Sequence, residues 1–271
     1  MSALTPEAFG DWTVPTRRRG AGRPVLFVHG SADSPLLWRG VMDELDGVES
    51  IALDVPNAVE DDDPPPTLQG SCLERDYEIL SSVVDAFERP ALVAHSYGAL
   101  LALRFARRRP QALSALMLIE PIAFGLIRDA GGVYDAVQQA CAAFLQSFDD
   151  RAREDGLRAL IDYWNGDGTW DAFPGRIRVR LSKGALRTRA EVLTGDQDRT
   201  TEADLGRIPT PAAVVLGQST TVASRAICWQ LASGLPDATL HRVDGAGHSP
   251  ARSHPVEVAE HVRALLARAP A

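Results

Sequence analysis

The amino-acid sequence predicts an α/β fold in which a mostly parallel sheet is flanked by helices. Short apolar segments alternate with helix-like segments along most of the 271 residues, and this alternation is typical of parallel sheets that are covered on both faces. Near the middle of the chain, an apolar run at 91–94 passes directly into an alanine- and leucine-rich helix. We expect strands at 25–28, 50–55, 91–94, 115–119, 212–216 and 239–243, with a weaker one at 9–14, and helices at 35–45, 70–88, 97–108, 223–234 and 255–268.

Length and composition favour a soluble protein of one domain with an insertion. A chain of this length buries about three-quarters of its unfolded surface, and its net charge of −8 argues against a nucleic-acid or anionic-membrane partner. The N-terminus shows no secretory signal and no segment is long and apolar enough to span a membrane. The three cysteines lack metal-ligand spacing. We therefore expect a cytoplasmic protein without metal or cofactor, and the oligomeric state stays open.

The strand-to-helix segment carries a candidate nucleophile, Ser96. Residues 94–98 read Ala-His-Ser-Tyr-Gly, close to the G-x-S-x-G pattern of a sharp turn that lifts a serine out of the sheet edge. The first glycine of that pattern is replaced by Ala94, which is still small. The turn also places the backbone N–H of Tyr97 at a helix N-terminus, where partial positive charge favours an oxyanion.

Two further segments carry the other parts of such a site. His248 follows the expected strand at 239–243 and is flanked by Gly245 and Gly247, which allow a tightly folded loop. At the other end of the chain, the strand at 25–28 is followed by His-Gly-Ser. The backbone N–H of Ser31 in that loop is the expected second oxyanion donor.

Taken together, these motifs resemble those of the α/β-hydrolases, in family order and over nearly the whole chain. The resemblance implies that Ser96 is the nucleophile and His248 its general base. It also implies that the helix-rich interval 122–208, which falls between the sixth and seventh strands of the family's count, is a cap over the active site. The hydrolase core then comprises residues 1–121 and 209–271.

The catalytic acid departs from the family pattern. In most relatives this carboxylate follows the seventh strand, but residues 214–225 contain neither Asp nor Glu. We favour Glu120, at the end of the sixth strand, a position used by certain haloalkane dehalogenases. Asp196 and Asp198 are rival acids, and a dyad or a degenerate site is a further alternative. Asp244 is expected to cap a turn.

Two aromatic residues are candidates for the substrate pocket. Trp164 lies in the middle of the expected cap, and Trp38 follows the oxyanion loop, although Trp38 also fits a place in the core. His95 is expected to pack under the turn that presents Ser96.

Carboxylic-ester hydrolysis through an acyl-enzyme is the expected activity, with a small acyl compound as substrate. A serine nucleophile excludes the aspartyl-ester chemistry of the carboxylate branch of the family. Thioester, lactone, amide or C–C bond cleavage would use the same residues. Two alternatives from other classes are a non-hydrolytic enzyme on this scaffold and a binding protein derived from a hydrolase.

Overall fold

The computed structural model describes residues 4–55, 72–146 and 150–269. Within these residues the chain forms an eight-stranded sheet in the order β1-β2-β4-β3-β5-β6-β7-β8. The pairings of β1 with β2 and of β2 with β4 are antiparallel, and the others are parallel. The strands are β1 (Thr5–Phe9), β2 (Trp12–Gly20), β3 (Arg23–Val28), β4 (Val48–Leu53), β5 (Ala91–His95), β6 (Ala115–Ile119), β7 (Ala212–Gly217) and β8 (Ala238–Val243).

The predicted α/β class is confirmed, and two local expectations are partly right. The weak strand expected at 9–14 spans a hairpin: β1 ends at Phe9, β2 begins at Trp12, which pairs with Phe9, and Gly10 in the turn between them has a φ of 60°. A glycine adopts that conformation at little cost, so the chain reverses there. The helix expected at 35–45 is a 3₁₀ turn, η1 (Pro35–Trp38), followed by the short helix α1 (Arg39–Asp43).

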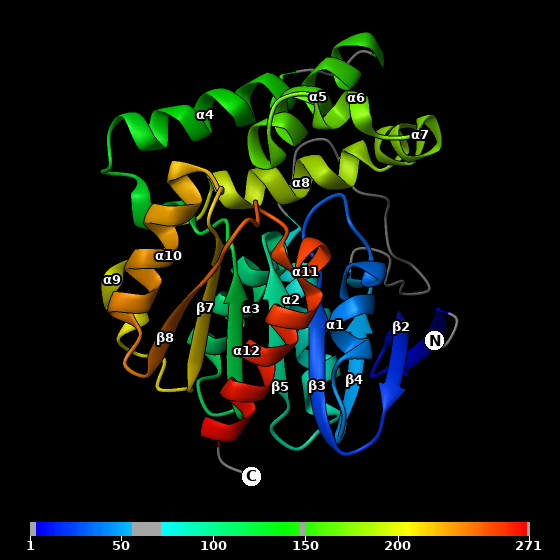
Figure 1. The fold of residues 1–271 in the computed structure, drawn as a ribbon, viewed down its shortest axis with the longest axis vertical. Helices are drawn as coiled ribbons and strands as arrows, with labels where there is room; N and C mark the ends of the chain where they lie inside the picture. Colours follow the sequence, from blue (N-terminus) through cyan, green and yellow to red (C-terminus); the bar gives the residue numbers. More distant parts are fainter. Residues whose placement is uncertain (1–3, 56–71, 147–149, 270–271) are drawn as a thin grey trace.

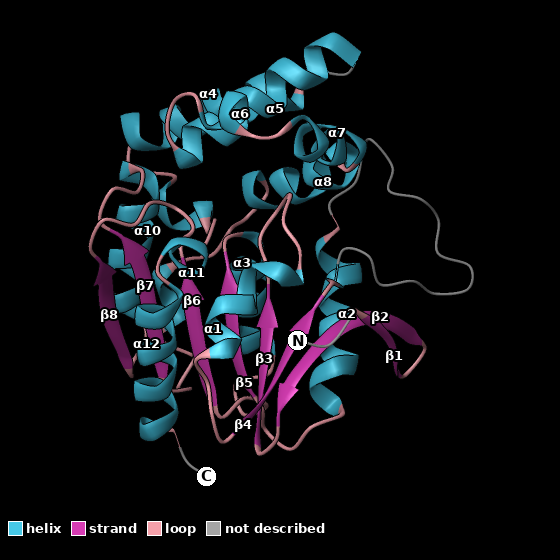
Figure 2. Ribbon diagram, turned by 45° about the vertical axis from the view of Figure 1, so that its right-hand side comes forward, coloured by secondary structure: helices cyan, strands magenta, loops and turns pink. Residues whose placement is uncertain are grey.

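Helices cover both faces of the sheet (Figures 1 and 2). On β5, Leu92 and Ala94 belong to the apolar core beneath α2 (Leu73–Asp85) and α3 (Tyr97–Arg108). The alternate residues Ala91 and Val93 belong to a second core that contains residues of α1 and α12. Burial on both sides explains why the central strands are continuously apolar. The remaining helices of the sheet layer are α10 (Val222–Gly234), α11 (Pro250–Ser253) and α12 (Pro255–Arg268).

Helices also fill the interval between β6 and β7. Those from α4 to α8, which we call the cap helices, lie above the carboxyl ends of the strands, whereas α9 lies beside α10 (Figures 1 and 2). The apolar core of the α2–α3 face continues into the cap helices. The elements of the interval are η3 (Phe124–Ile127), α4 (Gly132–Leu145), α5 (Asp150–Asn165), α6 (Thr169–Ala172), α7 (Gly175–Lys183), α8 (Ala185–Asp196) and α9 (Glu202–Leu205).

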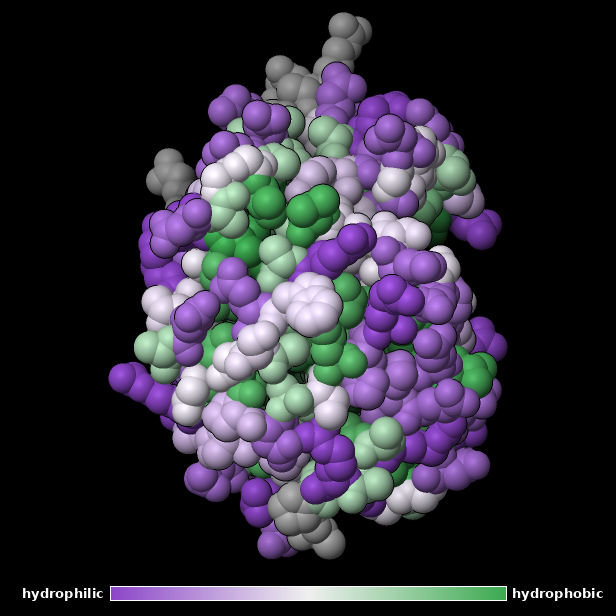
Figure 3. Space-filling view, turned by 60° about the vertical axis from the view of Figure 1, so that its left-hand side comes forward, coloured by the Kyte–Doolittle hydropathy of each residue, from purple (hydrophilic) through white to green (hydrophobic). Residues whose placement is uncertain are grey.

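The outer surface mixes apolar and polar side chains. Figure 3 turns the left side of Figure 1 forward and shows green apolar groups between purple polar ones. Val222 and Trp229 of α10 are among the exposed apolar residues. Among the residues that the structure describes, none of the helices combines the length and apolarity that a membrane crossing requires.

Candidate active site

The turn between β5 and α3 holds Ser96 in a strained backbone conformation. Its φ and ψ are 54° and −117°, a region that residues with a Cβ rarely adopt. The Ser96 N–H donates to the carbonyl of Ile119 at 2.9 Å, which ties the turn to β6. A Cβ on Gly98 would lie 2.4 Å from the carbonyl oxygen of His29. Only glycine therefore allows α3 to start this close to the end of β3.

His248 is hydrogen-bonded on both sides of its imidazole ring. Its Nε2 lies 3.1 Å from the Ser96 hydroxyl, and its Nδ1 lies 3.0 Å from Oε2 of Glu120. Because a carboxylate accepts, Nδ1 carries the proton and Nε2 is free to accept from Ser96. All three side chains are buried, with exposed fractions of 7% for Ser96, 6% for His248 and 0% for Glu120. The structure thus brings the three expected catalytic residues together in one hydrogen-bonded chain.

The carboxylate of Glu120 is held by the neighbouring strand end. The backbone N–H of Gly217, the last residue of β7, donates to its Oε1 at 2.7 Å. The hydroxyl of Thr220 donates to its Oε2 at 2.5 Å. A Cβ on Gly217 would lie 2.2 Å from the carbonyl oxygen of Gly247, so glycine is needed where the His248 loop passes β7.

The other carboxylates that the sequence offered are engaged elsewhere. Asp198 accepts from the N–H of Gly125 at 2.8 Å, and Asp196 accepts from the side chain of Gln138 at 2.5 Å. Asp244 is exposed and pairs with Arg242 at 3.0 Å. None of these contacts reaches His248.

His95, which precedes Ser96, contacts the backbone of His248. Its Nε2 donates to the carbonyl oxygen of His248 at 2.8 Å, and burial lowers the pKa of His95 to about 3. His95 therefore stays neutral over the pH range in which most proteins are folded. Its place under the turn agrees with a packing role and fixes the start of the His248 loop.

A cavity of about 270 Å³ opens between Ser96 and the cap helices. Trp164 of α5 lies against the ring of His248, with ring centroids 4.8 Å apart, and stacks on Phe124 at 6.1 Å. Ser31 lies in the wall beside Ser96, and Tyr97 is the first residue of α3. Apolar residues dominate the rest of the wall, namely Ile122, Phe124, Leu160, Ile161, Trp164, Phe173, Ile177, Leu181 and Val192.

Trp38 does not line this cavity, which corrects the expectation for that residue. It is fully buried and packs against Phe27 in the core on the α12 face, with ring centroids 5.2 Å apart. The 3₁₀ turn η1 directs the side chain of Trp38 toward the sheet instead of the strand ends.

Several residues of the site carried no signal in the sequence. Thr220 and Gly217 contact Glu120 only because β6 and β7 are neighbours. Asp33 after β3 pairs with Arg252 of α11 at 2.6 Å, and both line the cavity. In the sequence, the only signals of this ion pair are that Asp33 follows the His-Gly pair and that Arg252 follows His248. Within the described ranges, no cluster of three or more His, Cys, Asp or Glu side chains has a geometry suited to a metal ion.

Comparisons with known proteins agree with this fold. A sequence profile described as "Alpha/beta hydrolase family" matches residues 25–261. A haloalkane dehalogenase of Sphingobium indicum is 34% identical over 109 residues, which cover 38% of this chain and 37% of that protein. The chain thus spans well under half the length of this curated relative.

Two solved structures share the fold over nearly their whole length. An esterase from Thermogutta terrifontis has a TM-score of 0.72 at 18% identity, covering 98% of this chain and 97% of that one. A 2-hydroxy-6-oxo-6-phenylhexa-2,4-dienoate hydrolase from a Rhodococcus species has a TM-score of 0.74 at 18% identity, covering 97% and 96%. Because the family profile matches most of the sequence and the sheet has the matching architecture, the chain belongs to the alpha/beta hydrolase family.

Proposed function

We propose that this protein is a serine hydrolase that cleaves the ester of a small carboxylic acid through an acyl-enzyme on Ser96. The observation that carries the proposal is the position of His248, whose two ring nitrogens lie 3.1 Å from the Ser96 hydroxyl and 3.0 Å from Glu120. A nucleophile, a base and a carboxylate in this relation are the parts that acyl transfer needs.

Each group has a defined part in the reaction. Nε2 of His248 takes the hydroxyl proton while Ser96 Oγ attacks the acyl carbon, and Glu120 stabilises the imidazolium that forms. The backbone N–H groups of Tyr97 and Ser31 hold the negative oxygen. The imidazolium returns its proton to the leaving alcohol, which departs as the acyl-enzyme forms. Water, deprotonated by His248, then attacks the acyl carbon, and the acid is released as the imidazolium gives that proton to Ser96 Oγ.

The cavity favours a short apolar acyl or alcohol group. Its volume of about 270 Å³ is just below the range of roughly 300–1,000 Å³ that is usual for ligand pockets. In this proposal residues 122–208 act as a lid, and Trp164 shields the imidazole from water while the substrate is bound.

A fluorophosphonate followed by intact-mass measurement tests the nucleophile. We expect one adduct on the wild type, none on Ser96→Ala, and much slower labelling of Glu120→Gln. A folded wild type that gains no mass would refute the proposal, because an activated serine reacts with this reagent.

A series of p-nitrophenyl esters tests the substrate class. We expect kcat/KM to be highest for acetate or butyrate and to fall for octanoate, whose longer chain has to share the cavity with the p-nitrophenyl group. A butyryl thioester, a butyrolactone and a vinylogous diketone extend the series to the other bonds that the same residues could cleave. A higher kcat/KM for one of these would reassign the substrate.

A further inference from the structure

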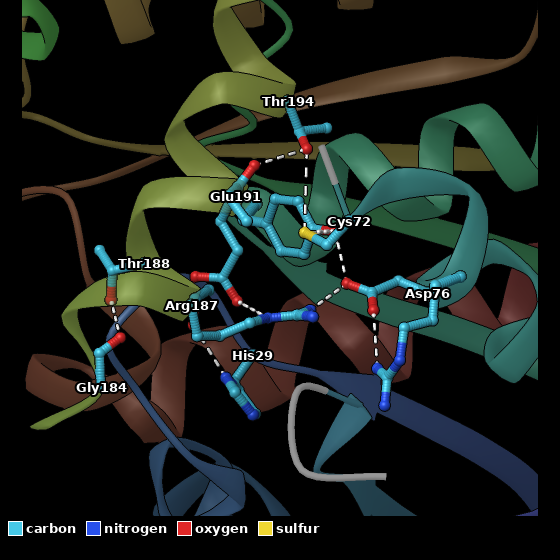
Figure 4. Close-up of polar contacts among 12 residues, drawn as sticks. His29, Cys72, Asp76, Gly184, Arg187, Thr188, Glu191 and Thr194 are labelled. Atoms are coloured by element: carbon cyan, nitrogen blue, oxygen red, sulfur yellow. Dashed lines mark hydrogen bonds and ion pairs between the residues drawn. The ribbon is translucent and has the colours of Figure 1, made fainter. Parts of the chain in front are cut away.

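A buried polar network joins the cap to α2 and to the helix that follows Ser96. Figure 4 labels its members Arg187, Glu191, Asp76 and Cys72. Arg187 of cap helix α8 pairs with Asp76 of α2, and its Nε donates to Glu191 at 3.0 Å. The hydroxyl of Tyr97 donates to Asp76 Oδ2 at 2.5 Å. Cys72 Sγ lies 3.1 Å from that hydroxyl. We call these five residues the Arg187 network.

The network is buried, so its contacts are costly to break. Asp76 and Glu191 are 0% and 1% exposed. Burial lowers the pKa of Arg187, yet the two carboxylates hold that pKa above its usual range. Burial and the charge of Asp76 raise the pKa of Tyr97, which keeps its phenol protonated as a donor. Removing one partner would leave a buried charge uncompensated. Because Arg187 belongs to the cap and Asp76 to the core, their ion pair exists only while the cap lies on the core.

Tyr97 touches both the network and the reaction. It directly follows Ser96 and begins α3, and its backbone N–H is one of the two oxyanion donors of the proposed reaction. Its ring is buried, with the Arg187 guanidinium 6.0 Å from the ring centroid. Asp76 anchors the side chain at its hydroxyl, and the backbone of Tyr97 is part of the turn that presents Ser96.

We propose that Arg187 is a positioning residue: by holding Asp76 and the Tyr97 hydroxyl, it aims the Tyr97 N–H at the oxyanion and so couples cap closure to reaction at Ser96. This inference rests on the proposed serine-hydrolase function. Arg187 does not line the cavity beside Ser96. In this inference it nevertheless affects the rate of acylation, through Tyr97.

A double-mutant cycle of Arg187→Gln and Tyr97→Phe tests the route of the effect. Tyr97→Phe removes the hydroxyl and leaves the pair of Arg187 and Asp76 in place. We expect each single variant to lower kcat for p-nitrophenyl butyrate and the fluorophosphonate labelling rate by about 10- to 100-fold, since small displacements of a reacting group or donor cost this much. KM should stay within about twofold, and the double variant should be no slower than the slower single variant.

Arg158→Gln is the matched control. Arg158 belongs to an exposed pair with Asp171 within the cap helices, and loss of an exposed pair changes little. If Arg187→Gln fails to fold, Arg187→Gln combined with Glu191→Gln replaces it, because that pair removes one charge of each sign.

Four outcomes would overturn the proposal. Arg187→Gln could lower Tm and still react at the wild-type rate, which would make the network purely structural. Tyr97→Phe could react at the wild-type rate, or the rate losses of Arg187→Gln and Tyr97→Phe could multiply in the double variant. Either result would show that Arg187 does not act through the Tyr97 hydroxyl. A raised KM with unchanged kcat would assign Arg187 to substrate binding.

Hydrogen exchange separates this inference from the proposed function. Arg187→Gln and Tyr97→Phe should both speed exchange in a peptide covering residues 94–103, while a peptide covering 212–217 stays unchanged. If the wild type gains no fluorophosphonate mass, the proposed function fails. Hydrogen exchange then becomes the only test of whether Arg187 positions the backbone of Tyr97. Equal exchange at 94–103 in wild type and variants would then reject it.

Discussion

The ends of β6 and β7 differ in what they bring to the candidate site. The two strands are parallel neighbours, with Ile119 paired with Val215. β6 leads into the carboxylate of Glu120, whereas β7 ends with two hydrogen-bond donors, the N–H of Gly217 and the hydroxyl of Thr220. The resemblance to the family implied the carboxylate at the second of these ends.

This difference shows that the place of the acid is a matter of reach. Neighbouring strands lie about 4.8 Å apart, and a glutamate is one methylene longer than an aspartate. A carboxylate from the β6 end can therefore meet Nδ1 of His248, which lies 3.0 Å from it. The β7 end, relieved of the carboxylate, supplies the donors that orient it.

The largest effect is expected where both strand ends converge, at the nucleophile and base. Ser96→Ala and His248→Ala should each lower kcat for p-nitrophenyl butyrate by about a millionfold, because the triad acts as a unit. Combining the two should cost little more. Substantial turnover by folded Ser96→Ala would mean that another group attacks the substrate.

Removing the carboxylate from the β6 end should cost less. Glu120→Gln is expected to lower kcat by about ten-thousandfold, because the amide no longer stabilises the imidazolium. Asp244→Asn, which alters an exposed carboxylate paired with Arg242, is the control and should behave as wild type. If Glu120→Gln hydrolyses the ester normally, Asp196 and Asp198 become the candidates to test next.

Moving the acid to the β7 end should restore part of the activity. Thr220 Oγ1 lies 2.5 Å from Glu120 Oε2, so Thr220→Asp in the Glu120→Gln background places a carboxylate close to the original one. We expect kcat to recover by about 100-fold, the rest being lost because a displacement of about 1 Å costs that much. Thr220→Asn in the same background is the uncharged control, and equal recovery by both would show that charge is not the cause.

Loss of a single donor at the β7 end should have a smaller effect. Thr220→Val removes one hydrogen bond to Glu120 and keeps that of Gly217. A hydrogen bond to a charged group contributes about 1.5–3 kcal/mol, and we expect kcat to fall about tenfold. Thr221→Val removes the neighbouring hydroxyl, which caps α10, and should lower Tm without changing kcat. If kcat fell for Thr221→Val but not for Thr220→Val, the Thr220 hydroxyl would not be the donor that matters for catalysis.

The last prediction concerns the end of β5, where the effect appears in stability and should leave the chemistry at Ser96 unchanged. Burial lowers the pKa of His95 to about 3, against about 6.5 in an unfolded chain. Between these values the unfolded chain binds the extra proton, so the free energy of unfolding should fall by about 1.4 kcal/mol for each pH unit as the pH drops from 6.5. Urea unfolding from pH 7 to pH 4 measures this slope, which should be shallower in His95→Gln. Equal slopes would show that His95 titrates normally.

Prediction from the sequence succeeded where the signal is local. The Ala-His-Ser-Tyr-Gly turn and the glycines around His248 are short patterns that constrain backbone dihedrals directly. The positions of Ser96 and His248 therefore follow from the sequence alone. The chain reversal within the strand expected at 9–14 and the place of Trp38 in the core were not predicted, for a related reason. An apolar pattern shows that a segment is buried, but it does not show where the chain reverses or which face of the sheet a side chain meets.

The sequence by itself determined the α/β class, the turn at Ser96 and the glycine-flanked loop of His248, because each follows from dihedral preferences and burial periodicity within about a dozen residues. The tertiary structure alone decided that Glu120 meets His248 while Asp196 and Asp198 do not, that Trp38 enters the core, and that Arg187 reaches Asp76. These contacts join residues far apart in the chain, and they depend on the order of the strands in the sheet and on how the cap helices pack against it.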